Sequence, residues 1–170
     1  MNKVIRVVVA VALTFLVVPS SVAAVEKNPY GAPVVDPAGP NESIFTVSKS
    51  AKKVDFTFSQ LKKMKTSKVT IFEPFVKKNQ TFTVIPMKDF FKRVGISGSD
   101  SVSTVALNDY VFKSTAAKFI AANALIAIER NGVEIPYDQG GPIRLIFAKS
   151  SSWSKNLDAW NWSLASLTVK

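Results

Sequence analysis

An Asn131-Gly132 pair between two apolar runs constrains the fold of this chain more than any other local feature. Both positions tolerate the positive φ angles of a tight two-residue turn, so the pair predicts a β-hairpin. The hairpin joins a strand at 125–130 to one at 133–135, and Pro136 then ends the pairing. The chain must therefore build a sheet that contains antiparallel strands.

Further short apolar runs alternate with polar residues or lie between turn residues, as strands do. They cover residues 44–47, 54–58, 69–76, 81–85, 102–107, 110–113, 142–147 and 164–169. Turns are expected at 77–80, which makes a second hairpin, and at Asn108-Asp109.

Helical patterns are shorter. Ser59 can cap a helix that runs through Met64, and 114–121 is a short helical or irregular link. Pro86 opens a helix at a position that needs no amide hydrogen bond, and Gly95 ends it. Roughly nine strands and two or three helices predict an α+β fold class, a single mixed and sheet-rich domain.

The N-terminus has the pattern of a secretory signal peptide. Lys3 and Arg6 precede an uncharged run at 7–18, and small residues end at Ala24. The run is shorter than the about 20 residues of a transmembrane helix. We expect a cleaved signal peptide at 1–24 and a periplasmic protein; an uncleaved membrane anchor is the alternative.

Two further segments follow the signal peptide. Residues 25–43 hold four prolines and two glycines and are expected to form an extended arm, and 44–170 form the folded domain. Removal of 1–24 lowers the net charge from +10 to +8. That charge suits an anionic membrane face, an acidic protein or a phosphorylated ligand, and export makes nucleic acid the least natural partner. The lysines at 52–53, 62–65 and 77–78 lie in separate elements, which favours a solvated face.

The 170 residues include no cysteine and no histidine. The chain therefore has no disulfide, no thiolate metal ligand, no thiol nucleophile and no Ser/His/Asp set. Four carboxylates that could act as metal ligands, Glu73, Asp109, Asp138 and Asp158, are scattered along the sequence. We interpret them as acids of turns or of the surface. We expect no enzymatic activity, although a hydrolase that uses a pair of carboxylates is an alternative that the sequence does not exclude.

Five fragments occur in an order and spacing that resemble the molybdopterin-binding domain of the sulfite oxidase family, from about residue 54 to the end. They are Val84-Ile85-Pro86-Met87 with Phe90-Phe91, Ala106-Leu107-Asn108-Asp109-Tyr110, Asn131-Gly132, Gly140-Gly141-Pro142-Ile143-Arg144-Leu145 and Trp162-Ser163-Leu164-Ala165-Ser166-Leu167. The resemblance implies that family's fold and a pocket for a pterin.

One departure from the family decides what the resemblance implies about function. The family's enzymes bind molybdenum through a cysteine in the region that corresponds to 69–78, and this segment has none. The chain is similar to small periplasmic pterin-binding regulators, which lack the cysteine and convey pterin status to a membrane-bound enzyme that makes or breaks cyclic di-GMP. The resemblance thus implies a reduced pterin as ligand, no molybdenum, and the periplasmic domain of a GGDEF/EAL-type membrane protein as signalling partner.

The residues also suggest where a pterin would bind. Trp153, Trp160 and Trp162 lie within ten positions, and Asn161 lies between two of them. A pterin is a flat polar bicycle that needs an aromatic plate and a few hydrogen-bonding partners. Each Trp can instead be core, and Trp153 in a Ser-rich loop is expected to be the most exposed.

Five further residues complete the candidate pterin site. Arg144 lies inside an apolar strand and is either an ion-pair partner or a ligand donor. The resemblance places the Asn108-Asp109-Tyr110 turn beside the pocket, and Glu73 is a candidate acceptor for the pterin amino group. Two other functions stay open: an accessory or vestigial molybdopterin oxidoreductase-like protein, and an interaction module that uses the basic face and the arm.

Overall fold

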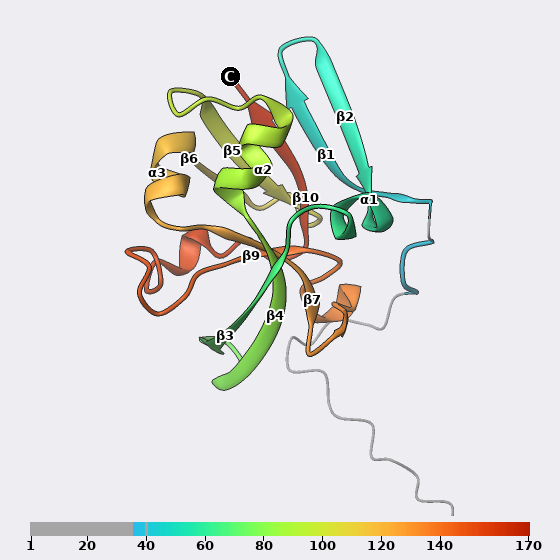
Figure 1. The fold of residues 1–170 in the computed structure, drawn as a ribbon, viewed down its shortest axis with the longest axis vertical. Coiled ribbons are helices and arrows are strands. Elements are labelled where there is room, and N and C mark those ends of the chain that lie inside the picture. The colour runs from blue at the N-terminus through green and yellow to red at the C-terminus, as the bar shows by residue number, and fades with distance from the viewer. Residues whose placement is uncertain (1–35, 40) are drawn as a thin grey trace, which may run out of the picture.

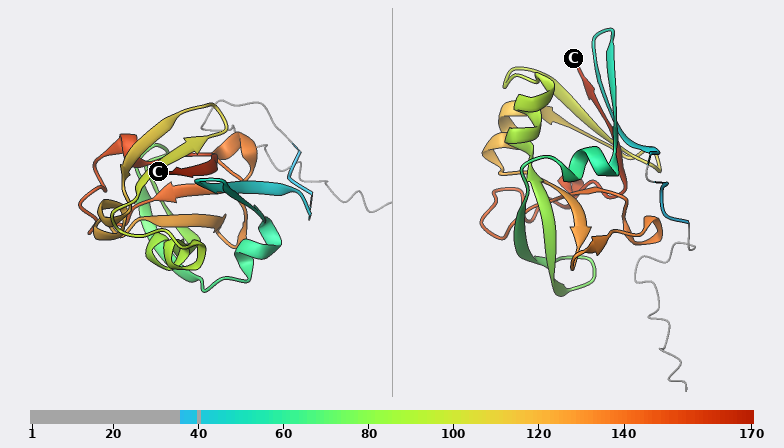
Figure 2. Two further views of the ribbon diagram at one scale, coloured as in Figure 1. Left: turned by 90° about the horizontal axis from the view of Figure 1, so that it is seen from above. Right: turned by 45° about the vertical axis from the view of Figure 1, so that its right-hand side comes forward.

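The computed structural model describes residues 36–39 and 41–170, which form two β-sheets and three α-helices (Figure 1). The first sheet has the strand order β2-β1-β10-β5-β6. Its strands are β1 (Ser43–Lys49), β2 (Lys52–Thr57), β10 (Leu164–Val169), β5 (Ser101–Ala106) and β6 (Val111–Thr115). β1 pairs in parallel with β10, whereas the other neighbours are antiparallel. The β1–β2 hairpin stands out from the body beside the end of β10 (Figure 2).

The second sheet has the order β3-β4-β7-β8, and β9 also pairs with β7. Its strands are β3 (Ser67–Glu73), β4 (Lys78–Pro86), β7 (Leu125–Arg130), β8 (Val133–Glu134) and β9 (Arg144–Ile146). All of its pairings are antiparallel. The expected Asn131-Gly132 hairpin is confirmed between β7 and β8, with φ angles of 53° and 83° at its two central residues.

The helices are α1 (Phe58–Lys62), α2 (Met87–Val94) and α3 (Ala116–Ala121), with two 3₁₀ turns, η1 (Tyr137–Gln139) and η2 (Leu157–Ala159). The expected helix after Pro86 is confirmed as α2, and Gly95 ends it in the left-handed conformation with φ 73°. The prediction that Ser59 caps the first helix is wrong. Thr57 is the cap, because its hydroxyl accepts from the Gln60 amide while the Gln60 side chain accepts from the Thr57 amide.

The expected turn at 77–80 is also placed wrongly. β3 ends at Glu73 and β4 already begins at Lys78, so the turn is 74–77. The Glu73 carboxylate accepts hydrogen bonds from the amides of Phe75 and Val76, at 3.0 and 2.7 Å. This side-chain cap ends the strand four residues before the polar residues that predicted the turn.

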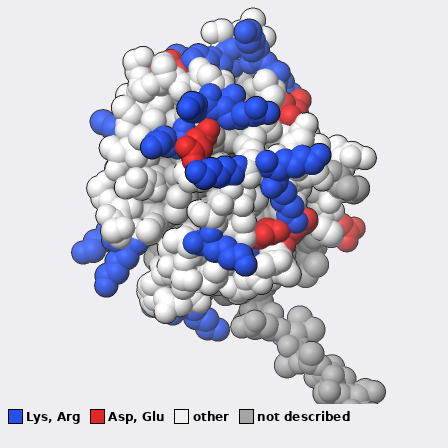
Figure 3. Space-filling view, viewed as in Figure 1, with Lys and Arg blue, Asp and Glu red and all other residues white. Residues whose placement is uncertain are grey.

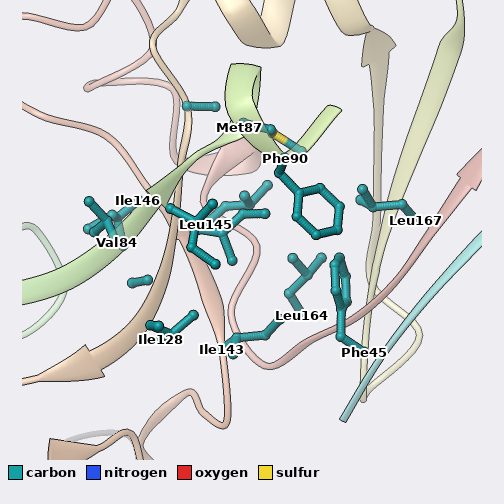
Figure 4. Close-up of a cluster of buried hydrophobic side chains, with 14 of the residues drawn as sticks. Phe45, Val84, Met87, Phe90, Ile128, Ile143, Leu145, Ile146, Leu164 and Leu167 are labelled. Atoms are coloured by element: carbon teal, nitrogen blue, oxygen red, sulfur yellow. The ribbon is translucent and has the colours of Figure 1, made fainter. Parts of the chain in front are cut away.

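One hydrophobic core fills the space between the sheets and α2 (Figure 4). Phe45, Leu164 and Leu167 come from the first sheet, and Val84, Ile128, Leu145 and Ile146 come from the second. Met87 and Phe90 of α2 are fully buried against both groups. The structure confirms the predicted α+β, sheet-rich class.

The expected signal peptide at 1–24 and most of the expected arm at 25–43 lie outside the described residues. Within 36–39 and 41–170, no helix has the length and apolar character needed to cross a membrane.

Candidate functional site

Three loops that are distant in the sequence surround a cavity of about 320 Å³. They are the β3–β4 turn, the β5–β6 turn and the segment from η2 to β10. The lining residues are Phe75, Ala106, Asn108, Tyr110, Leu157, Asp158, Trp160 and Trp162. The volume lies at the lower end of the range of ligand pockets, about 300–1,000 Å³.

Aromatic rings form one wall of this cavity. The Phe75 ring meets Trp162 edge-on with centroids 4.0 Å apart, and it lies 6.4 Å from the ring of Trp160. Phe75 is 43% exposed, whereas Trp160 is 5% exposed. Edge-to-face contact is a favourable arrangement for aromatic pairs. The wall is therefore anchored in the protein at the tryptophans and open to solvent at Phe75.

A buried ion pair lies beneath the aromatic wall. Arg144 Nη2 is 2.7 Å from Glu73 Oε1, and neither side chain is exposed. The other oxygen of Glu73 accepts from the amides of Phe75 and Val76. The pair thus connects β9 to the turn that carries Phe75.

Arg144 also supports the aromatic wall directly, because its guanidinium carbon lies 4.6 Å from the Trp162 ring centroid. Gly140 makes room for both side chains: a Cβ at this position would lie 3.3 Å from Arg144 Nη1 and 3.5 Å from Trp162 Cβ. Arg144 and Glu73, both candidate ligand residues, are therefore placed under the cavity and bonded to each other.

The rim of the cavity is polar. The Tyr110 hydroxyl donates to the Asp158 carbonyl oxygen at 2.9 Å, and Asn108 Oδ1 accepts from the Tyr110 amide at 3.3 Å. Burial, together with the nearby Asp158 charge, raises the pKa of the Tyr110 hydroxyl above its ordinary value. Asp109, a candidate site residue, holds the turn with φ 62° and does not line the cavity.

One buried donor stands out in this wall. The indole N–H of Trp160 is inaccessible to solvent and has no hydrogen-bond partner among the described residues. A buried donor without a partner costs free energy, so a ligand that reached this N–H through a small shift of the wall and accepted from it would bind with an added gain. A pterin ring carries a carbonyl oxygen and ring nitrogens that can accept.

Asn161 and Trp153 do not line the cavity. Asn161 is fully buried, and its Nδ2 donates to the backbone oxygen and hydroxyl of Thr104, each at 3.1 Å. Trp153, expected to be the most exposed of the three tryptophans, is half-buried, with ring centroids 5.3 Å from Phe119 and 5.4 Å from Phe112. Trp162 is half-buried as well and Trp160 is buried, so the order of exposure between Trp153 and Trp162 stays a prediction. The Ser151 hydroxyl holds this loop by donating to Ala122 O and accepting from the Trp153 amide.

The cavity brings together Asn108, Tyr110, Trp160 and Trp162 of the nine predicted site residues. It adds Phe75 and Leu157, which the sequence analysis did not select, and Asp158, which it treated as a surface acid. Phe75 follows Pro74 in the segment where the family's metal ligand was expected. An aromatic residue in a hairpin turn that replaces the family's metal ligand is the signal by which Phe75 could have been identified as a site residue.

The structure thus combines a two-sheet α+β fold with an aromatic cavity, in a sequence that has no cysteine. A sequence model of the family described as "Oxidoreductase molybdopterin binding domain" matches residues 32–159. The chain belongs to this family.

A solved structure with a similar fold is the sulfane dehydrogenase SoxCD from Paracoccus pantotrophus, with a TM-score of 0.58 and 11% sequence identity. The similarity covers 84% of this chain and 45% of the dehydrogenase chain, so this chain spans less than half of that protein. A comparison with curated proteins finds no match.

The family description implies molybdopterin as cofactor. The residues of this chain fit the pterin part of that cofactor but do not fit a molybdenum ion bound by the protein. The pterin fits the aromatic wall, the unpartnered Trp160 N–H and the polar rim. A protein-held molybdenum does not fit, because the sequence has no cysteine and the Glu73 carboxylate is bonded to Arg144 and two amides. Among the described residues, no cluster of three or more His, Cys, Asp or Glu side chains could hold a metal ion.

Proposed function

We propose that this protein is an exported, non-catalytic pterin-binding protein that relays pterin status to a membrane-bound enzyme of cyclic di-GMP metabolism. The observation that carries the proposal is the aromatic cavity of Phe75, Trp160 and Trp162, built over an ion pair instead of a thiolate. The partner would be the periplasmic domain of a GGDEF/EAL-type protein. This part of the proposal is supported by the resemblance of the sequence to cysteine-less periplasmic regulators.

The cavity residues can interact with a reduced pterin by ring stacking and by hydrogen bonding. Trp162 and Phe75 offer ring surface for stacking, and the Trp160 N–H offers a donor. The Asn108 side chain and the Asp158 carboxylate, both exposed at the rim, can accept from the pterin amino group and ring N–H. A pterin supplies the matching donors and acceptors along one edge of a flat ring. No step of bond making or breaking is needed for this role.

Fluorescence titration tests pterin binding. Adding tetrahydropterin or dihydropterin to the purified protein should quench tryptophan emission saturably. Trp162→Ala should weaken binding by about 1–3 kcal/mol, or roughly 5- to 150-fold, the range found for base–aromatic stacking. Trp153→Phe is the matched control, because Trp153 does not line the cavity. Equal weakening by both variants would contradict the site.

Elemental analysis tests the non-catalytic part. Protein made in a molybdate-replete host should carry far less than one molybdenum per chain and turn over neither sulfite nor sulfoxide, because no thiolate is available. Stoichiometric molybdenum would instead favour an accessory or vestigial molybdopterin oxidoreductase-like protein.

Export and signalling are tested separately. Mass spectrometry of periplasmic protein should find a mature N-terminus within about two residues of Val25. A relay also needs the pterin-bound and empty forms to differ in affinity for the partner, since a ligand without differential affinity shifts no equilibrium. A pull-down of the partner's periplasmic domain should therefore change on addition of pterin; no change would leave a storage or scavenging role.

A further inference from the structure

A second feature lies on the face of α2, apart from the aromatic cavity. Two adjoining cavities of about 480 and 320 Å³ share Lys65 and Asp89 as lining residues. The larger one lies between α1 and α2 and is also lined by Lys63 and Arg93; the smaller one is lined by Lys88. We name the two cavities together the α2 groove. It has no lining residue in common with the aromatic cavity.

The α2 groove carries positive charge that the protein itself does not neutralise. Lys63, Lys65, Lys88 and Arg93 of its lining, and Lys92 beside them on α2, are exposed, and none forms an ion pair within the described part of the chain. Asp89 is the only carboxylate among the described lining residues. Figure 3 shows Lys and Arg side chains gathered around an acidic group on this face.

The neighbouring Lys62 shows the contrast. Its ammonium lies 2.9 Å from Glu129 Oε1 and 3.5 Å from Glu134 Oε1. Glu129 and Glu134 are therefore already engaged by Lys62. Asp89 is one carboxylate against four cations among the described lining residues, so the groove can accept a further acidic group from another molecule.

The floor of the α2 groove is apolar. Phe56, Ile85 and Phe90 form the bottom of the larger cavity, with Met64 half-buried beside them. Ile120 and Leu125 line the smaller one. A cationic rim over an apolar floor complements a ligand that is acidic and also carries an apolar side chain.

We propose that the α2 groove is a docking surface for an acidic segment of a partner protein, anchored by an apolar side chain in the larger cavity. The cations are spread along two cavities instead of converging on one point, which suits an extended chain better than a single small anion. The aromatic side chains of the lining, Phe56 and Phe90, are buried in the core, so stacking platforms for the bases of a nucleic acid are absent from the described lining. A concave surface also suits a peptide better than a membrane. This inference does not depend on pterin binding.

The test uses the mature protein and a fluorescein-labelled peptide of Asp and Glu residues with one central Leu. Binding should be salt-sensitive, and replacing all Asp and Glu of the peptide by Asn and Gln should abolish it. The double variant Lys65→Glu/Arg93→Glu should bind at least about 10-fold more weakly, because attraction becomes repulsion at the rim. Replacing the peptide's Leu by Ser should weaken binding several-fold if the floor is used.

The matched control is Lys52→Glu/Lys113→Glu, which changes the net charge equally at exposed positions outside the groove. It should weaken binding by less than about twofold at physiological salt, where distant charges are screened. Thermal melts of both variants establish that they are folded. Equal loss in both variants, or no peptide binding at low salt, would overturn the proposal. So would vesicles of phosphatidylglycerol that bind the wild-type protein while the peptide does not, since the surface would then belong to a membrane.

Discussion

Glu73 and Arg144 are 71 positions apart in the sequence, and their side chains form a 2.7 Å ion pair that is completely buried. Glu73 ends β3 and Arg144 begins β9, two strands that are not neighbours in the second sheet. The carboxylate also binds the amides of Phe75 and Val76. The pair therefore sets the position of Phe75 against Trp162, and with it the shape of the aromatic cavity.

Removal of one partner of this ion pair should destabilise the protein strongly. Arg144→Met leaves the buried Glu73 carboxylate without its counter-charge, which costs about 3–5 kcal/mol. That is a large share of the about 5–15 kcal/mol of a typical domain. Urea unfolding followed by tryptophan fluorescence measures the loss. The double variant Glu73→Gln/Arg144→Met removes both charges and should recover part of the stability. A double variant with the summed cost of the two single changes would contradict the coupling.

Trp160→Phe should weaken pterin binding, and because Trp160 is buried in the core, the void left by the smaller ring should also lower stability somewhat. The change keeps a ring in the wall and deletes the buried N–H, which has no partner in the described part of the protein. We expect a loss of about 1 kcal/mol, or roughly fivefold in Kd, the size of one hydrogen bond. Titration with dihydropterin and a thermal melt measure the two quantities. Unchanged affinity in Trp160→Phe, together with weaker binding in Trp162→Ala, would show that stacking acts without this donor.

Gly141→Ala should prevent correct folding of the segment before β9. A Cβ at this position would lie 1.8 Å from the Ile135 carbonyl oxygen and 2.7 Å from that of Pro136, so the backbone must shift. We expect a loss of about 3 kcal/mol or more, measured by urea unfolding. Gly98→Ala is the control, because its Cβ would meet only Ala117 Cβ at an ordinary 3.6 Å. Similar losses at both positions would contradict the steric explanation.

Stability should fall at acidic pH through Asp100. The Lys49 ammonium, 2.5 Å away, and the Ser97 amide lower the pKa of Asp100. A carboxyl whose pKa is lower in the folded state stabilises the protein above its ordinary range, about pH 4, and loses this contribution as the pH falls further. The difference in unfolding free energy between wild type and Asp100→Asn should therefore be constant near neutral pH and shrink below about pH 4. In a Lys49→Met background this pH dependence of stability should be smaller. If it is unchanged, groups other than the Lys49–Asp100 pair cause the pH dependence.

Local signals predicted several elements correctly because the forces that form them act within a few residues. Asn131-Gly132 produces its hairpin through the backbone freedom of both residues, and Gly95 ends α2 for the same reason. The strand expected at 164–169 is found over the same residues. The β3–β4 turn was misplaced because a carboxylate held by the distant Arg144 caps the strand.

The sequence by itself determined the α+β class, the absence of any thiolate or imidazole, and the presence of tryptophans near the C-terminus. The tertiary structure decided which aromatic side chains line the same cavity. Trp160 and Trp162 lie beside Phe75 in one wall of the cavity, while Trp153 packs with Phe119 and does not line it. Period and turn chemistry specify the local path of the chain, but the shared spaces depend on long-range strand pairing and burial, which no local pattern encodes.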